Sequence, residues 1–501
     1  MSSTAPLPEA NVLRIEILVN AGPGETRAAQ IENGILQDVH IQRDATASAV
    51  SNIYLGKVQR VLAGMQAAFV DIGLERAAFL QISDMVRSEE AADSAEASRI
   101  EKRLHAGDRV LVQVTRDAMG TKGARLTTDL AIPSRFLVYM PHTPRIGVSA
   151  RIESDEERSR LYDAVADLRR ELDLPGGFIV RTVADNASTA ALGADMRFLA
   201  TVWADIQHQA RRVPVETLVY GDLPLPIRML RDLLTPDVSA VLIDDERAWH
   251  DMIGFTRRFA PEFAERILLH KDAAPLFAQY GIEDAIQRAL QPKVPLKSGG
   301  FLIIEQTEAM VTVDVNTGGF VGTRSLEQTV LRTNLEAAQT VARQLRLRNL
   351  GGIIVIDFID MVDAEHKRQV LAQLSETLAA DPAKTSVGQI SGLGLVEVTR
   401  KRTRESLEHL LCMPCEACGG RGYVKTPETI ALELFREIAR RARIRPHTDS
   451  ELLVLAPPDT IDQLLDAQAA VFECVCREAG VDVRLQAEAL YGPEQFDVVV
   501  M

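Results

Sequence analysis

The sequence contains few cysteines and no excess of basic residues. The sequence has five cysteines in 501 residues, an odd number that cannot form a disulfide framework. They favour a reducing compartment, where thiols stay free or bind a metal. The 56 Lys and Arg residues are outnumbered by 70 Asp and Glu, which gives a formal net charge of −14. This acidity argues against a broad basic surface for nucleic acid, but it is compatible with local basic patches.

The sequence also lacks long hydrophobic runs. No stretch approaches the roughly 18 consecutive apolar residues of a membrane-spanning helix, and the first residues have neither the basic nor the apolar region of a signal peptide. Hydrophobic residues nevertheless make up 46% of the chain and charged residues 25%, which excludes wholesale disorder. At roughly 100–200 residues per domain, the length predicts several domains. We expect a cytoplasmic, multidomain protein with no membrane partner.

Short strands punctuated by glycine run from residue 51 to about residue 128. Hydrophobic stretches such as Ala67–Gly73 and Arg109–Val114 follow one another closely, which predicts a small β-barrel of the OB type. From residue 134 to 220 helices mix with strands. Helices are predicted over 156–172 and 196–213 and a strand over 177–183, and these segments indicate a separate small module.

Between residues 292 and 381 hydrophobic strands alternate with long helices. Strands around Val311–Val315 and Ile353–Phe358 flank a helix predicted over 329–350, and a second helix follows over 364–380. This pattern is typical of a layered α/β unit. A joint rich in glycine and cysteine over 412–422 precedes a last segment of helix, strand, helix and strand, which predicts a small α/β domain.

Two acidic residues follow β-branched runs in the α/β unit. Asp314 lies in Val313-Asp-Val-Asn-Thr-Gly and Asp357 in Val355-Ile-Asp-Phe. Two carboxylates on neighbouring rigid strands suit a hard cation such as Mg²⁺, which prefers oxygen ligands. Asn316 faces the same way as Asp314, two residues away, and is placed to bind a phosphate oxygen. The alternative for each Asp is a helix cap or a lysine pair, but the combination favours a metal site, with Asp360 interpreted as structural.

Cys412, Cys415 and Cys418 form two overlapping C-x-x-C spacings before a glycine-rich turn. This spacing lets two thiolates bind one tetrahedral zinc ion. Because a pair supplies only two of four ligands, either Cys412 and His409 complete the site or two chains each contribute a pair and zinc links a dimer. A redox pair is the alternative, but no thioredoxin-like strand precedes it. The remaining cysteines are predicted to pack in a core: Cys474 and Cys476.

Other residues suit contact with nucleic acid. Phe69 and Phe79 lie among small residues of the barrel, where they either stack on bases or pack in the core, and Lys122 lies in a glycine-rich turn that could meet phosphates. Arg181-Thr182, at a predicted strand end, could clamp a phosphate. The run Arg400-Lys-Arg-Thr-Arg404 is most simply a solvated basic surface, with contact to a nucleic-acid backbone as the alternative.

Together these motifs resemble the ribonuclease E/G family over nearly the whole chain. The carrying segments are Asn52-Ile-Tyr, Ala67-Ala-Phe-Val-Asp-Ile-Gly, Arg181-Thr182, Val313-Asp-Val-Asn-Thr-Gly, Gly351-Gly-Ile-Ile-Val-Ile-Asp-Phe-Ile-Asp-Met, Gly394-Leu-Val-Glu-Val-Thr-Arg-Lys-Arg-Thr-Arg-Glu-Ser-Leu and Cys415-Glu-Ala-Cys-Gly-Gly-Arg-Gly. The resemblance is nearer to the G-type than to the E-type members, because the sequence has no long tail rich in proline and arginine.

The resemblance implies a multidomain fold of α/β and α+β parts. An OB-fold RNA-binding domain at 48–129 is expected within an RNase H-like subdomain split between 1–47 and 222–291, where Asp244 and Asp245 would be structural. A 5′-sensor domain is expected at 130–221 and a DNase I-like catalytic domain at 292–411. A zinc knuckle at 412–425 and a small C-terminal α/β domain at 426–501 complete the expectation.

The resemblance also implies a magnesium-dependent endoribonuclease. Such an enzyme cuts single-stranded, A/U-rich RNA, prefers a 5′ monophosphate, and acts in ribosomal RNA 5′-end maturation and mRNA decay. By position, Asp314 and Asp357 match the family's Mg²⁺ ligands, and Asn316 matches the residue beside the scissile phosphate. Cys415 and Cys418 match a pair that shares Zn²⁺ across a homodimer, from which a tetramer could be built.

Further family positions concern RNA binding. The resemblance assigns three residues to gripping RNA in the barrel: Phe69, Phe79 and Lys122. It assigns Arg181 and Thr182, backed by Val138, to the pocket that reads the 5′ monophosphate. A further sensor arginine of the family aligns with Lys384, which keeps the charge but loses the bidentate fork. The alternatives are a non-catalytic RNA-binding protein or an E-type enzyme that organises a degradation complex.

Overall fold

The structure, a computed structural model, describes residues 14–44, 48–86, 99–118, 122–318, 326–402, 404–444 and 451–501. The chain divides into two compact units, a first unit over Met1–Leu407 and a second unit over Glu408–Met501. A short helix, α10 (Leu407–Leu411), lies at their boundary. No helix within the described residues is both long and apolar enough to cross a membrane.

A five-stranded sheet joins two distant parts of the first unit. Its strand order is β15-β14-β1-β2-β3, with bounds Ile267–Leu269, Val238–Ile243, Ile15–Gly22, Glu25–Glu32 and Ile35–Arg43. Asp244 tightens the join, because its carboxylate accepts hydrogen bonds from Asn20 Nδ2 at 2.7 Å and Ala21 N at 2.9 Å. Four helices belong to this region: α4 (Leu225–Leu233), α5 (Glu246–Phe259), α6 (Leu276–Gln279) and α7 (Ile282–Ala289). Asp245 caps α5 by accepting from Ala248 N.

A small closed barrel follows β3 in the chain. Its five strands are β4 (Ile53–Leu62), β5 (Ala67–Asp71), β6 (Ala78–Gln81), β8 (Arg125–Thr127) and β7 (Arg109–Arg116), and pairing of β4 with β7 closes the ring. The strand β13 (Thr217–Tyr220) adds to β4, and α1 (Ile100–Arg103) also packs near it. Small and aliphatic side chains such as Ala68, Val70 and Leu80 fill the interior. The predicted OB-like barrel is therefore confirmed.

A four-stranded sheet and two helices form the next part. The strands run in the order β11 (Ile146–Val148), β12 (Gly177–Val180), β10 (Leu137–Met140) and β9 (Ile132–Pro133). The helices are α2 (Asp155–Glu171) and α3 (Thr189–Arg212), each capped by a serine side chain, Ser154 or Ser188. α3 begins earlier than predicted because of the Ser188 cap. The strand predicted over 177–183 is shorter, since a 3-10 turn follows Arg181.

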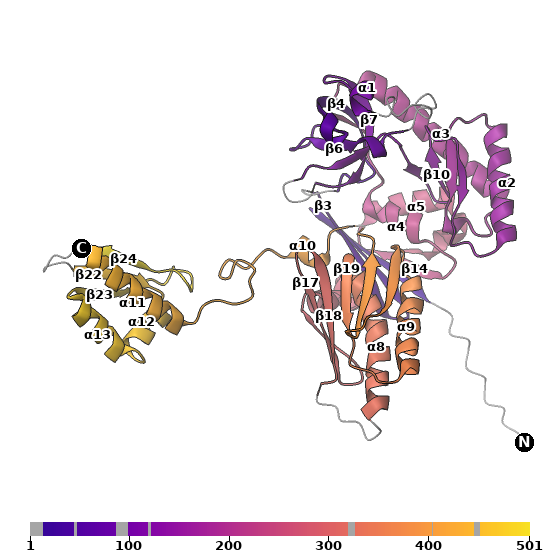
Figure 1. The fold of residues 1–501 in the computed structure, drawn as a ribbon. Helices are drawn as coiled ribbons and strands as arrows, with labels where there is room; N and C mark the ends of the chain where they lie inside the picture. Colours follow the sequence, from indigo (N-terminus) through magenta and orange to yellow (C-terminus); the bar gives the residue numbers. More distant parts are fainter. Residues whose placement is uncertain are drawn as a thin grey trace, which may run out of the picture. The chain divides into compact units, whose positions relative to one another are not determined.

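A six-stranded sheet with helices on one face forms the last part of the first unit. Its order is β16 (Lys293–Pro295), β17 (Phe301–Gln306), β18 (Met310–Asn316), β19 (Gly352–Asp357), β21 (Leu395–Arg400) and β20 (Thr385–Ile390). The helices α8 (Leu326–Leu347) and α9 (Ala364–Ala379) lie side by side (Figure 1). Core residues from both helices contact the strands, so the opposite face of the sheet is left open.

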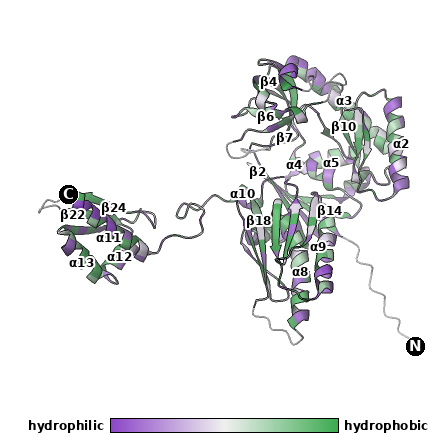
Figure 2. Cartoon of the chain, in the orientation of Figure 1, coloured by the Kyte–Doolittle hydropathy of each residue, from purple (hydrophilic) through white to green (hydrophobic). Residues whose placement is uncertain are grey.

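The two central strands show why one face is open. In β18 and β19, Val313 and Ile356 are buried against the helices, whereas Asp314 and Asp357 are exposed. This alternation is the two-residue period of a half-buried strand. Helix α8 likewise carries both hydrophobic and hydrophilic residues (Figure 2). It ends at Leu347, earlier than predicted, because Asn349 adopts a left-handed conformation with φ of 48°.

The second unit is a small α/β domain. It contains α11 (Pro427–Ile444), α12 (Pro458–Leu465), α13 (Ala469–Ala479) and a sheet in the order β23 (Asp482–Ala487), β22 (Glu451–Ala456) and β24 (Asp497–Val500). One helix and one strand more are present than the pattern predicted. The core prediction for Cys474 is wrong: it lies exposed on α13, where no residue of the helix is fully buried.

Short 3-10 turns connect several of these elements. They span Ala63–Met65, Ile82–Asp84, Thr182–Ala184 and Pro261–Arg266. Two of them lie in the barrel, and Pro261–Arg266 links α5 to β15. The turn at Thr182–Ala184 directly follows Arg181. It therefore shapes the backbone at Arg181-Thr182, the pair that could clamp a phosphate.

Candidate functional site: an acidic cluster, an aromatic barrel row and a guanidinium pocket

Asp314 and Asp357 lie directly opposite each other on neighbouring strands. β18 and β19 are parallel, and their register pairs Asp314 with Asp357. Opposite residues in a sheet are about 4.8 Å apart at the backbone and project to the same face. Asp357 is the last residue of β19, one residue before the predicted strand end, whereas Asp314 lies two residues inside β18. The sheet therefore presents both carboxylates together on its open face.

The charge around these carboxylates is not balanced. Partial burial raises the pKa of Asp357 above its usual range, and the negative charges of Asp314 and Asp360 raise it further. Within the described residues no Lys or Arg forms an ion pair with any of the three. Asp360, interpreted as structural from the sequence, thus adds to the same negative cluster. Such an excess of negative charge fits a bound cation.

Two neighbouring features shape the cluster. Asn316 donates from Nδ2 to Asp314 Oδ2 at 2.8 Å, which leaves its amide oxygen on the open face. After Asn316 the chain turns at Gly318, where φ is 64° and an added Cβ would lie 2.4 Å from the Gly299 carbonyl oxygen. Only glycine fits this turn. The turn therefore brings backbone close beside the end of β18.

The protein donors at this cluster are few. In the part of the chain that the structure describes, no three His, Cys, Asp or Glu side chains lie close enough to hold a metal ion by themselves. Mg²⁺ commonly binds one or two protein carboxylates and takes its remaining ligands from water and substrate phosphates. The donor set at Asp314 and Asp357 fits that mode, and it does not fit a cage built wholly of protein.

The barrel carries a row of aromatic and basic side chains. Cross-strand register aligns Arg60 on β4 with Phe69, Phe69 with Phe79, and Phe79 with Arg125 on β8. The phenyl rings contact edge to face with centroids 5.9 Å apart, and the Arg60 guanidinium lies 5.7 Å from the Phe69 centroid. Both rings are only partly buried. The structure therefore places them outside the core. Lys122 is exposed and lies shortly before β8 in the sequence.

Arg181 and Thr182 lie at the end of β12 with defined partners. The Arg181 guanidinium donates to the Ser134 carbonyl oxygen and to Asp232 Oδ1, each at 2.6 Å. Thr182 Oγ1 lies 2.8 Å from Ser149 Oγ on the loop after β11. Val138 lies on the neighbouring strand β10, opposite Ile179. The guanidinium is thus held in place, with part of its charge balanced by Asp232.

Arg151 links the Arg181–Thr182 segment to the six-stranded sheet. Its guanidinium donates to the carbonyl oxygens of Asp381 at 2.9 Å and Pro382 at 3.0 Å, just before Lys384. The Arg151 backbone N–H donates to Ser149 Oγ, the same hydroxyl that contacts Thr182. The structure therefore connects the segment bearing Lys384 to the Thr182 pocket through one arginine, which the sequence analysis did not identify.

The expectation of a solvated surface for the basic run at 400–404 is wrong for Arg400, whereas Lys401, Arg402 and Arg404 are exposed. Arg400 is buried and pairs with Asp381, at 2.8 Å between Nε and Oδ2. Arg402 donates to the Gly351 carbonyl oxygen, and Arg404 donates to Asp38 on β3. Thr403 lies outside the described residues. Three arginines of the run therefore have structural partners, and the partners come from other parts of the chain.

Cys415 and Cys418 lie in a tight turn of the second unit. Positive φ values at Gly419, Gly420 and Gly422 fold the backbone back on the thiols. Hydrogen bonds, led by that from Gly422 N at 3.3 Å to Cys418 Sγ, lower the pKa of the Cys418 thiol. A thiolate is the form that binds zinc. Neither Cys412 nor His409 joins the pair in a three-ligand cluster within the described residues.

The sequence analysis missed two cations of the barrel, Arg60 and Arg125, and the strand pattern gave no signal for Arg60. Arg60 lies on a strand whose outward residues are polar, Lys57 and Gln59 among them, whereas Val58 points inward. A strict period of two would place Arg60 on the inward face with Val58, yet the Arg60 side chain is exposed. Its alignment with Phe69 depends on a register shift between Val58 and Arg60, which no local pattern shows. Arg125 is partly engaged by Asp84, at 2.8 Å.

The fold and the site define a class of protein: a multidomain α/β protein that combines an OB-like barrel, an acidic cluster on an open sheet face and a guanidinium pocket. Ribonuclease G of Escherichia coli K12 is 48% identical over 492 residues, which are 97% of this chain and 99% of that protein. Ribonuclease G of Haemophilus influenzae is 46% identical over 493 residues, with the same coverage. Ribonuclease E of E. coli K12 is 36% identical over 473 residues, 93% of this chain and 44% of that protein.

A sequence model described as the ribonuclease E/G family matches residues 131–403. The chain belongs to the ribonuclease E/G family, as the match and the coverage of its relatives show. It is an endoribonuclease of that family, and RNA is its class of substrate. The resemblance read from the motifs is thereby confirmed.

Proposed function

We propose that the chain is a cytoplasmic, magnesium-dependent endoribonuclease that cuts single-stranded, A/U-rich RNA and prefers substrates with a 5′ monophosphate. Ribosomal RNA 5′-end maturation and mRNA decay are its proposed processes. The observation that carries the proposal is the register of Asp314 with Asp357, next to Asn316. Family membership supports the same reading, because the relatives named above are ribonucleases.

At the acidic cluster, Asp314 and Asp357 would hold the Mg²⁺ ion. The chemistry that the ion would supply there is activation of a water molecule and stabilisation of the charge that develops on the phosphate. Asn316 orients the scissile phosphate through its amide, while its bond to Asp314 keeps that carboxylate in position. The Asp360 carboxylate increases the attraction for a cation. Cleavage leaves a 5′ phosphate and a 3′ hydroxyl.

RNA binding is divided between two other parts of the first unit. In the barrel, Phe69 and Phe79 stack on bases while Arg60 and Lys122 contact phosphates. In the pocket at the end of β12, the Arg181 fork and the Thr182 hydroxyl bind the 5′ phosphate, with Val138 beside them. Lys384 contributes a further charge. Partial neutralisation of Arg181 by Asp232 supports a moderate preference for the monophosphate.

We also propose that Cys415 and Cys418 bind zinc between two chains. The lowered pKa of the Cys418 thiol supports metal binding, and the pair supplies only two of four tetrahedral ligands. A second chain contributes the other pair. The result is a homodimer, and two such dimers can associate as a tetramer.

Cleavage of one A/U-rich, single-stranded RNA tests the substrate proposal. The RNA carries either a 5′ monophosphate or a 5′ hydroxyl, and the reaction contains Mg²⁺ or EDTA. We expect cutting only with Mg²⁺ and faster cutting of the monophosphate form. Thr182→Val should reduce that preference and leave cutting of the hydroxyl form unchanged. Tight binding without any cutting would instead identify a non-catalytic RNA-binding protein.

A further inference from the structure

A second cavity lies apart from the acidic cluster, the barrel row and the pocket at Arg181. It has a volume of about 360 Å³ and is formed by the β2–β3 turn, α7, β16 and α8. Three cationic residues line it: Arg288, Lys293 and Arg343. Tyr280 and Gln344 add polar groups. In the described part of the chain, no Asp or Glu is among its lining residues, although the chain as a whole is acidic.

Three glutamates on elements around this cavity already have other partners. Their ion pairs are Glu32 with Arg346 at 2.9 Å, Glu283 with Arg27 at 2.8 Å, and Glu16 with Arg14 at 3.0 Å. None of these pairs includes a cation that lines the cavity. Among the residues that the structure describes, Arg288, Lys293 and Arg343 form no ion pair with a carboxylate.

Arg343 shows the electrostatic consequence most clearly. It projects from α8 and is partly buried, and burial lowers the pKa of its guanidinium because no described carboxylate lies close enough to offset the cost. Lys293 is exposed, and its Nζ lies 4.1 Å from the centroid of the Phe301 ring, which attracts the charge but does not neutralise it. An anion bound beside the partly buried Arg343 would offset the cost of burying its charge.

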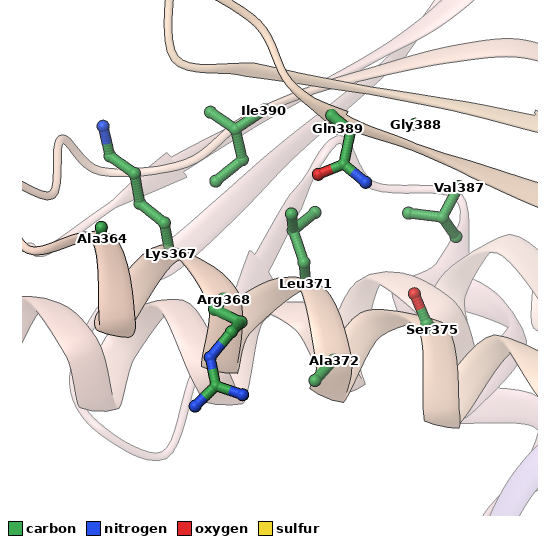
Figure 3. A pocket seen from close by; sticks show the side chains of 10 residues that line it. All are labelled: Ala364, Lys367, Arg368, Leu371, Ala372, Ser375, Val387, Gly388, Gln389 and Ile390. Carbon is green, nitrogen blue, oxygen red and sulfur yellow. The ribbon is translucent and has the colours of Figure 1, made fainter.

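Another cavity of the first unit, lined by described residues, offers a useful contrast. It lies between α9 and β20, where Lys367 and Leu371 point toward the strand and Arg368 points away from it (Figure 3). Arg368 is bound to Glu365, with Nη2 at 2.7 Å from Oε1. Among its lining residues, only Lys367 is a cation without a described ion pair. The cavity at Arg343 has three such cations.

We propose that Arg288, Lys293 and Arg343 form a binding site for a phosphate group. Guanidinium forks and an ammonium group are the side chains that recognise phosphate oxygens, and the Tyr280 hydroxyl and the Gln344 amide can add hydrogen bonds. The phosphate belongs either to a free phosphate ester or to an RNA backbone outside the acidic cluster. Because β16 is the edge strand of the six-stranded sheet and α8 packs on that sheet, a bound phosphate would bridge the sheet to the β2–β3 turn.

Calorimetric titration of the full chain with inorganic pyrophosphate tests this site. The variants are Arg343→Gln and Arg288→Gln, and Lys367→Gln, which removes the same charge at the other cavity, is the matched control. We expect each pocket variant to bind pyrophosphate about tenfold more weakly than wild type and the control to bind normally. Thermal melting confirms that each variant is folded. Any pyrophosphate that binds at Arg181 would bind equally in all variants. If Arg343→Gln and Arg288→Gln both bind pyrophosphate as wild type does, the proposal is overturned.

RNA titrations then distinguish the two sources of phosphate. Binding of a single-stranded RNA with a 5′ hydroxyl is measured by fluorescence anisotropy in EDTA. If Arg343→Gln weakens RNA and pyrophosphate alike, the site holds an RNA phosphate. If only pyrophosphate binding weakens, the site holds a free phosphate ester. Either result supports a phosphate site. If Arg343→Gln weakens binding of neither RNA nor pyrophosphate, the proposal is contradicted.

Discussion

The buried pair between Arg400 and Asp381 yields the strongest stability prediction. Their side chains are 4% and 3% exposed, and the Arg400 fork reaches both carboxylate oxygens, at 2.8 and 3.2 Å. A further guanidinium nitrogen donates to the Leu350 carbonyl oxygen at 2.9 Å. Arg400→Met keeps an aliphatic side chain but leaves the Asp381 carboxylate buried without a counter-charge. The pair also anchors the segment that Arg151 contacts.

The cost follows from the burial of the pair. Removing one partner of a buried ion pair costs about 3–5 kcal/mol, because the remaining charge is uncompensated. A loss of 1 kcal/mol lowers the melting temperature of a domain of about 150–250 residues by roughly 2–4 °C. The expected fall in melting temperature is therefore about 6–20 °C. A double variant, Arg400→Met with Asp381→Asn, removes the stranded charge and should recover part of the loss.

Differential scanning calorimetry of the full chain measures this effect. Arg368→Met is the matched control, because Arg368 makes an exposed pair with Glu365 and its side chain is 76% exposed. Exposed pairs contribute about 0–1 kcal/mol, so the control should melt close to wild type. If Arg400→Met and Arg368→Met melt at the same temperature, the reasoning about the buried pair is refuted.

Three further predictions concern RNA and zinc. Arg151→Gln should lower the rate advantage of a 5′ monophosphate severalfold while 5′-hydroxyl RNA is cut at the wild-type rate, and a loss of both rates together would argue for simple misfolding. Phe69→Ala should raise KM for single-stranded RNA about tenfold, since stacking contributes about 1–3 kcal/mol per base, whereas an unchanged KM would place the ring outside the RNA path. Cys415→Ser should lose zinc by elemental analysis and become a monomer by light scattering; a zinc-loaded dimer would contradict the shared site.

Sequence patterns predicted the central strands and the barrel because burial there follows simple periods. Alternation in Val313-Asp-Val separates a buried face from an exposed one, so Asp314 could be assigned to the open face before its partner strand was known. Glycine spacing and short hydrophobic runs likewise indicated a small barrel. Helix starts were less accurate, although Ser154 and Ser188 were available as capping signals.

Features that depend on distant parts of the chain could not be predicted. The pattern of the basic run predicts a solvated surface, because nothing in it shows that Arg400 meets Asp381 or that Arg404 meets Asp38. The position of Arg151 beside the Asp381 carbonyl depends on how two sheets pack. The cavity at Arg343 arises only where α7, β16 and α8 converge. Local patterns specify elements and faces, whereas pairing between distant elements decides which charges are balanced.

Cleavage by Asp314→Asn and Asp357→Asn tests the central claim most directly. Both changes preserve the size of the side chain and remove one carboxylate charge from the pair that faces across β18 and β19. In Mg²⁺, we expect each variant to cut single-stranded RNA at least a hundredfold more slowly, while RNA affinity measured in EDTA stays within twofold of wild type. Wild-type cutting by both variants would show that this carboxylate pair is not the catalytic site.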